Sequence, residues 1–235
     1  MFYVHSIVKR GKALYYIDRT DLGKKMALRI GALGSVQPII ICLNESALST
    51  SIALASELRG WIFPLISENI QLASDDRIIG VIDSEGQYTV NPQLSSFELE
   101  DIMSEYHGMV DDKKREAFSK INRLDNSYAK IDPNILNGRL VILCGDIVRN
   151  QLQIGAVRTL LKPHTPIDII GVAGNIDVNA ADYLRLTANK TEMFDVMTSM
   201  FEDDHYFEKN DGYTTEQRHN IAVNISQFWK PATSK

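Results

Sequence analysis

The stretch that decides the fold is Arg139-Leu-Val-Ile-Leu-Cys-Gly-Asp-Ile-Val-Arg-Asn-Gln-Leu-Gln-Ile-Gly155. Its apolar run, residues 140–144, is too short for a buried helix and predicts a strand covered on both faces. Apolar residues then recur at helical spacing from Ile154 to Leu161. A polar turn carrying one carboxylate, Asp146, is expected between the two. Open α/β sheets bind ligands at such strand-to-helix turns, where backbone N–H groups and the helix dipole attract phosphate.

Strand and helix patterns alternate along the rest of the chain. Short apolar runs predict strands at residues 38–43, 61–66, 77–82, 88–90, 166–172 and 193–197. Helical patterns cover residues 20–33, 47–59, 97–125, 177–189 and 214–228. This alternation favours an α/β fold with an open parallel sheet flanked by helices. We expect a single domain over residues 1–235, with a hairpin and a charged helical insertion at residues 84–135.

The deciding stretch resembles the phosphoribosyl-pyrophosphate loop of type I phosphoribosyltransferases. That pattern is an apolar run, two acidic residues, a few small residues, and then Thr-Gly-x-Thr at the start of a helix. Laid on it without gaps, residues 141–144 are the apolar run, Gly145 and Asp146 take the acidic positions, and Asn150-Gln-Leu-Gln153 replaces the tetrad. The order of elements over residues 18–228 is similar to the subgroup with a long helical insertion. The resemblance implies the Rossmann-like type I phosphoribosyltransferase fold.

The resemblance also implies roles for residues of this loop. Asp146 matches the acid that contacts ribose, whereas Gly145 removes its companion. Charge-assisted hydrogen bonds contribute about 1.5–3 kcal/mol each, so loss of the tetrad weakens phosphate binding. The donors that remain for a phosphate are Arg149, Asn150, Gln151 and Gln153. The alternatives are a plain turn without a ligand and a helix-capping role for Asp146.

A second loop follows the strand at residues 38–43. Asn44, Glu45 and Ser46 take the place of the family's pyrophosphate loop. Glu45 repels pyrophosphate unless a cation intervenes, and a carboxylate can bind Mg²⁺ through water. Glu45 is therefore the candidate metal ligand. The alternative is a surface residue that the dipole of the following helix stabilises.

The net charge and the apolar stretches of the sequence limit the kinds of partner that we expect for the protein. A net charge of −5 argues against a nucleic-acid partner. No apolar stretch is long enough to span a membrane, and the N-terminal residues lack a signal-peptide pattern. Cys42 and Cys144 are expected to be buried in a reducing compartment. We therefore expect a cytoplasmic protein without a membrane or nucleic-acid partner.

Two charged clusters are expected to face solvent. The acidic cluster at residues 202–205 is interpreted as a solvated turn, and the five histidines lack metal-ligand spacing. The basic cluster is interpreted as a solvated helix face; it comprises Lys9, Arg10, Lys12, Arg19, Lys24, Lys25 and Arg29.

Three functions follow as hypotheses. The first is a catalytically impaired or inactive phosphoribosyltransferase-like protein, which binds a nucleotide or a sugar phosphate in the ancestral cleft. The second is an active transferase that uses phosphoribosyl pyrophosphate and Mg²⁺ with an unknown acceptor, with Asp146 holding ribose. The third is a structural homodimer formed through the helix at residues 97–125.

Overall fold

A five-stranded parallel sheet lies at the centre of the computed structural model, which describes residues 14–33, 36–72, 77–125, 132–214 and 217. Its strand order is β2-β1-β6-β7-β8. The strands are β1 (Ile39–Cys42), β2 (Trp61–Pro64), β6 (Leu140–Val148), β7 (Asp168–Asp177) and β8 (Lys190–Met197). Every residue of β1 and β6 is buried, as expected of strands covered on both faces. The predicted α/β architecture is confirmed.

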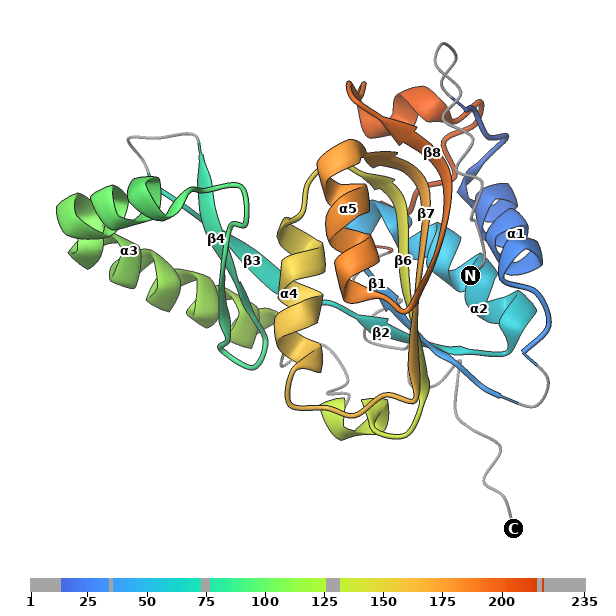
Figure 1. Ribbon diagram of the computed structural model, residues 1–235, viewed down its shortest axis with the longest axis horizontal. Coiled ribbons are helices and arrows are strands. Elements are labelled where there is room, and N and C mark those ends of the chain that lie inside the picture. Colours follow the sequence, from blue (N-terminus) through green and yellow to red (C-terminus); the bar gives the residue numbers. More distant parts are fainter. Residues whose placement is uncertain (1–13, 34–35, 73–76, 126–131, 215–216, 218–235) are drawn as a thin grey trace, which may run out of the picture.

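Helices cover both faces of this sheet (Figure 1). Helices α1 (Arg19–Ile30) and α2 (Leu48–Leu58) pack on one face, and α4 (Leu152–Leu161) and α5 (Val178–Thr187) pack on the other. Successive strand residues alternate between the two cores, so Ile40 and Cys144 lie under α1 and α2. Gly23 lets α1 approach α2 closely, because a Cβ at this position would lie 2.4 Å from the carbonyl oxygen of Thr50.

A smaller lobe projects from one side of the sheet (Figure 1). Strands β3 (Ser67–Gln71), β4 (Ile78–Asp83) and β5 (Tyr88–Val90) form an antiparallel sheet, on which α3 (Ser96–Asp125) packs. The lobe has a core of its own that includes Ile79, Ile102 and Val110. The insertion predicted from residue 84 shares this lobe with β3 and β4, which precede it in the chain. Thr89 and Thr159 join the lobe to α4 by a hydrogen bond of 2.9 Å between their hydroxyls.

Several element boundaries differ from the prediction. Strand β6 continues through Asp146 to Val148, and the turn before α4 carries no carboxylate. The expectation of a carboxylate in an open turn is thereby corrected. The sequence pattern misses strand β3, because its residues Ser-Glu-Asn-Ile-Gln are mostly polar. Most of the helix expected at residues 214–228 lies outside the described residues. None of the described helices is long and apolar enough to cross a membrane.

Short 3₁₀ helices complete the fold: η1 (Glu45–Ala47), η2 (Pro133–Leu136) and η3 (Asp203–Tyr206). The last of these is placed by pairing between segments far apart in the chain. Tyr16 and Phe207 form a parallel bridge, and the backbone N–H of Tyr16 donates to the carbonyl of Tyr206 at 2.9 Å. The N–H groups of Glu208 and Lys209 donate in turn to residues 16 and 17. This pairing holds η3 beside the N-terminus of α1.

Candidate functional site

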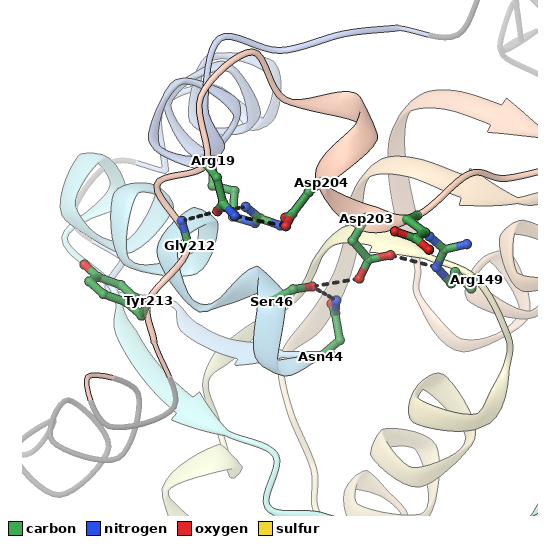
Figure 2. Close-up of a pocket in the computed structure, with 10 residues that line it drawn as sticks. Arg19, Asn44, Ser46, Arg149, Asp203, Asp204, Gly212 and Tyr213 are labelled. Atoms are coloured by element: carbon green, nitrogen blue, oxygen red, sulfur yellow. Dashed lines mark hydrogen bonds and ion pairs between the residues drawn. The ribbon is translucent and has the colours of Figure 1, made fainter.

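A cavity of about 650 Å³ opens where β1 and β6 end (Figure 2). Its size is typical of a site for a small molecule. The residues that line it come from the N-terminus of α1, the loops after β1 and β6, and the segment after β8. They are Arg19, Asn44, Ser46, Arg149, Glu202, Asp203, Asp204, Asn210, Gly212 and Tyr213. The position matches the carboxyl ends of parallel strands, where open α/β sheets bind ligands.

A buried ion pair lies behind this lining. Arg19 Nε is 3.0 Å from Asp146 Oδ2, and the two side chains are 3% and 0% exposed. The other oxygen, Asp146 Oδ1, accepts hydrogen bonds from Asn44 Nδ2 at 2.9 Å, from Ser46 Oγ at 2.9 Å and from the N–H of Ile147 at 2.7 Å. An ionised carboxylate has about four acceptor positions, so the protein itself saturates Asp146. A buried charge needs such partners.

Arg19 uses its remaining donors on the segment after β8. Its Nη2 is 2.7 Å from Asp204 Oδ1, and its Nη1 is 3.1 Å from Asn210 Oδ1. Burial alone would lower the pKa of Arg19, but its contacts with Asp204 and Asp146 outweigh burial and raise the pKa above its ordinary value. The guanidinium therefore stays charged and joins β6 to the segment after β8.

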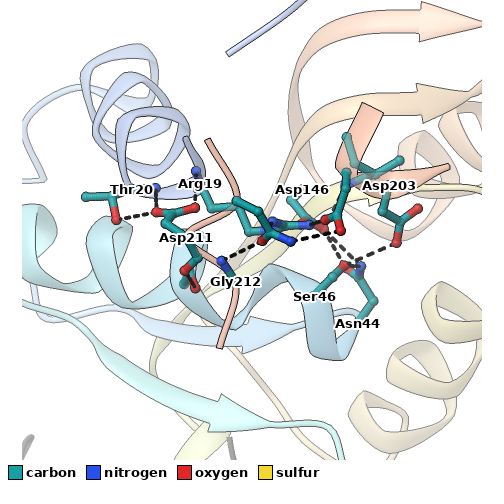
Figure 3. Close-up of polar contacts among 12 residues, drawn as sticks. Arg19, Thr20, Asn44, Ser46, Asp146, Asp203, Asp211 and Gly212 are labelled. Atoms are coloured by element: carbon teal, nitrogen blue, oxygen red, sulfur yellow. Dashed lines mark hydrogen bonds and ion pairs between the residues drawn. The ribbon is translucent and has the colours of Figure 1, made fainter. Parts of the chain in front are cut away.

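The N-terminus of α1 is held by a carboxylate from the same segment (Figure 3). Asp211 accepts from the N–H of Arg19 at 2.7 Å, from the N–H of Thr20 at 2.9 Å and from the Thr20 hydroxyl at 2.8 Å. These N–H groups lack partners within the helix. Asp18 accepts from the N–H of Asp21 and so caps the helix as well. Asp211 therefore fixes the helix end from which Arg19 reaches the cavity.

The second guanidinium of the cavity belongs to Arg149, directly after β6. Its Nε is 2.7 Å from Asp203 Oδ1, and its Nη2 donates to the carbonyl of Phe201. Asp203 Oδ2 is 3.5 Å from Ser46 Oγ, and Asn44 Nδ2 also contacts that hydroxyl. Both arginines of the lining are thus paired with carboxylates of the chain.

The predicted site residues divide into three groups. Asn44, Ser46 and Arg149 line the cavity, and Asp146 lies behind it. The remaining loop residues are not among those that line the cavity. Asn150 Oδ1 accepts from the N–H of Leu152 at 3.0 Å, Gln151 Nε2 donates to the carbonyl of Asn179 at 3.1 Å, and Gln153 is the second residue of α4. The Glu45 side chain lies outside the described part of the structure.

The sequence interpretation misses Arg19, Asp203 and Asp204. Arg19 is expected on a solvated helix face, yet it is 2% exposed. Asp203 and Asp204 are expected in a solvated turn, yet both line the cavity. No local pattern distinguishes these residues from surface charges, because their partners are more than 50 positions away in the chain.

The described side chains that line the site offer charged groups and hydrogen-bond donors and acceptors. Within the described ranges, no three His, Cys, Asp or Glu side chains are grouped so that they could hold a metal ion. Cys42 and Cys144 are buried, as predicted, and burial raises the pKa of the Cys144 thiol well above its ordinary value. A Cβ added to Gly145 would lie 2.3 Å from Val148 Cγ2, so the position of the missing acid has no room for a side chain.

Comparison with known proteins supports the fold. No protein-family model matches the chain, and no curated protein matches it. Among solved structures, the chain is similar to TT1426 from Thermus thermophilus, with 15% identity over 90% of this chain and 99% of that one and a TM-score of 0.68. A hypoxanthine-guanine phosphoribosyltransferase from Bacillus anthracis matches with 12% identity over 86% of this chain and 96% of that one, at a TM-score of 0.44. A hypoxanthine phosphoribosyltransferase from Staphylococcus aureus matches with 12% identity over 84% and 82%, at a TM-score of 0.43. At 15% identity the similarity to TT1426 concerns the fold alone.

Proposed function

We propose that this protein is a non-catalytic relative of the phosphoribosyltransferases that binds a nucleotide or a sugar phosphate in the cavity at the ends of β1 and β6. One observation carries the proposal. Asp146, which matches the ribose-binding acid in sequence, is fully buried and saturated by Arg19, Asn44, Ser46 and its own backbone neighbour. Its burial and its contacts support a structural role in the fold.

The burial and pairing of Asp146 bear directly on the transfer reaction. Displacement of pyrophosphate from phosphoribosyl pyrophosphate passes through an oxocarbenium-like state, which needs negative charge close to the ribose ring. The charge of Asp146 is neutralised by Arg19, and Gly145 has no space for a second carboxylate. Binding depends less than catalysis on this carboxylate, because the cavity has a volume of about 650 Å³ and a polar lining.

The experiment that tests the proposal combines turnover and binding. Phosphoribosyl pyrophosphate, Mg²⁺ and each of the common purine and pyrimidine bases are incubated with the protein, and the release of pyrophosphate is followed. We expect no release above the uncatalysed background. Calorimetric titration with ribose 5-phosphate and with a nucleoside monophosphate is expected to give saturable heat.

Two outcomes contradict the proposal. The first is turnover by the wild type above the uncatalysed background, which would favour the active transferase. The second is the absence of heat with every phosphorylated ligand at millimolar concentration. In that case the expected partner is another protein, such as a second copy of this chain bound through α3.

A further inference from the structure

Asp203 and Asp204, two consecutive residues of η3, each form an ion pair with one guanidinium group of the cavity. Asp204 pairs with Arg19 at 2.7 Å and also accepts from Asn210 Nδ2 at 2.9 Å. Asp203 pairs with Arg149 at 2.7 Å and lies 3.5 Å from the hydroxyl of Ser46. Figure 2 shows the two carboxylates pointing to different ends of the cavity, Asp204 to Arg19 and Asp203 to Arg149.

The groups around these carboxylates are guanidinium, hydroxyl and amide donors, the set with which proteins hold phosphate. We propose that Asp203 and Asp204 form an acidic latch, an internal anion that fills a site for a ligand with two neighbouring anionic groups, such as a diphosphate. The ligand binds by displacing the latch. This inference rests on the proposed function, since it concerns the regulation of the same cavity.

The two ion pairs of Arg19 differ in how easily they can be exchanged. The Asp146 side chain is 0% exposed, whereas the Asp204 side chain is 61% exposed. Exposed ion pairs contribute little to stability and are screened by salt. Breaking a buried pair leaves an uncompensated charge in the interior. Arg19 can therefore release Asp204 to a ligand while Asp146 keeps the guanidinium in place.

The latch also affects the charge that the cavity presents. With the latch in place, the two guanidinium groups of the lining face the carboxylates of Glu202, Asp203 and Asp204, and Arg19 is also paired with the buried Asp146. With the latch withdrawn, the same two guanidinium groups face only the carboxylates of Glu202 and Asp146. The net negative charge around the cavity is then removed, and an anion is repelled less.

The backbone around the latch is anchored on both sides. Tyr206 is 0% exposed, its carbonyl accepts from Tyr16, and its hydroxyl accepts from the N–H of Phe201 at 2.8 Å. Asp203 and Asp204 have partly exposed side chains that are held by ion pairs and hydrogen bonds to the cavity lining. The two side chains can thus exchange partners with a ligand while Tyr206 keeps the segment attached to the body.

The test uses inorganic pyrophosphate without metal as the probe. It is titrated by calorimetry into the wild type, Asp203→Asn, Asp204→Asn and the double variant. Asparagine keeps the size of the side chain and removes its charge. We expect the double variant to bind roughly tenfold more tightly than the wild type or better, with the single variants between them. Glu202→Gln is the matched control, since it removes a charge of the same lining next to the latch. It should give a smaller gain than either single variant.

The inference is overturned if the double variant has the melting temperature of the wild type and binds pyrophosphate no more tightly. If the double variant does not fold, Asp203→Asn decides, because it disturbs only the half-exposed pair with Arg149. These experiments distinguish failure of the latch proposal from failure of the proposed function. Binding of ribose 5-phosphate by the wild type without a gain in the variants overturns the latch alone. Turnover by the wild type overturns the non-catalytic role and leaves the latch result valid.

Discussion

Arg19 and Asp146 are 127 positions apart in the chain, yet their side chains form an ion pair of 3.0 Å that is almost completely shielded from water. The pair joins the first turn of α1 to the middle of the central sheet. Removing one partner of a buried pair leaves the other charged and unpaired, which typically destabilises a protein by about 3–5 kcal/mol.

Asp146→Asn is therefore expected to lower the free energy of unfolding by about 3–5 kcal/mol, measured by urea denaturation. Arg19→Met is expected to act in the same direction, and the double variant should lose less than the sum of the two. Asp182→Asn is the control, because its pair with Arg185 is exposed and should contribute about 0–1 kcal/mol. Equal losses of unfolding free energy for the buried and the exposed pair would refute the prediction that the buried pair contributes more to stability.

Tyr16→Phe removes a hydroxyl that donates to Asn175 Oδ1 at 2.8 Å inside the protein. Burial, and then the nearby charge of Asp195, raises the pKa of Tyr16 well above its ordinary value. The variant leaves a buried amide oxygen without its donor, so we expect a loss of about 1–3 kcal/mol in unfolding free energy. Tyr15→Phe is the control, since Tyr15 is 50% exposed and its hydroxyl contacts His205 at the surface. A larger loss for Tyr15→Phe would contradict the prediction.

Gly145→Ala places a methyl group 2.3 Å from Val148 Cγ2 in the interior of the sheet. Overpacking of this kind destabilises by about 1–3 kcal/mol, and Val148→Ala in the same chain should restore part of the loss. In contrast, an added Cβ at Gly108 in α3 meets nothing within 4 Å, so Gly108→Ala should stabilise by up to about 1 kcal/mol. Thermal unfolding of the three variants provides the measurement. No loss for Gly145→Ala would show that the sheet can yield at this point.

Asp83 predicts a pH dependence of stability. Burial raises its pKa, although the N–H groups of Gln87 and Glu85 act in the opposite direction. A carboxyl whose pKa is higher in the folded state binds protons more tightly there, so its contribution to stability falls as pH rises through that pKa. Asp83→Asn removes this effect. We therefore compare the free energy of unfolding of Asp83→Asn with that of the wild type. The variant's value minus the wild type's should increase as pH rises above the ordinary pKa of Asp, and it should then level off.

Urea denaturation of both proteins across a pH series measures this difference. Glu98 is the counterpart, because hydrogen bonds from Ser95 lower its pKa. The contribution of Glu98 to stability is fully present at pH values above the ordinary pKa of Glu, and it is lost as pH falls through the lowered pKa. Glu98→Gln should consequently give a difference that changes with pH in the opposite direction. A pH-independent difference for Asp83→Asn would contradict the prediction.

The sequence predicts best the elements whose signal is local. The apolar run at residues 38–43 forms β1, and the helical spacing at residues 97–125 forms α3 with Ile102 and Val110 buried. The strand predicted for β6 ends too early, because a carboxylate at position 146 usually indicates that a buried strand is over. A carboxylate can occupy the middle of a buried strand only when a partner neutralises it, and that partner, Arg19, is distant in the chain.

The candidate site is only partly predictable for the same reason. Asn44, Ser46 and Arg149 follow β1 and β6 in the chain, and they line the cavity that opens where these strands end. Arg19, Asp203 and Asp204 reach the cavity only because the segment at residues 14–18 pairs with the segment at residues 206–209. Pairing of two isolated short segments leaves no periodic pattern in the sequence.

That pairing also sets the order in which the protein can be assembled during synthesis. Residues 14–20 leave the ribosome before the carboxylates that hold them, because Asp195 follows Leu14 by 181 positions and Asp211 follows Arg19 by 192. Contacts of such long range form slowly compared with local ones. The cavity cannot be complete on a nascent chain until residue 211 has emerged, so a chain that stops before Asp204 would contain the whole central sheet and lack one wall of its site.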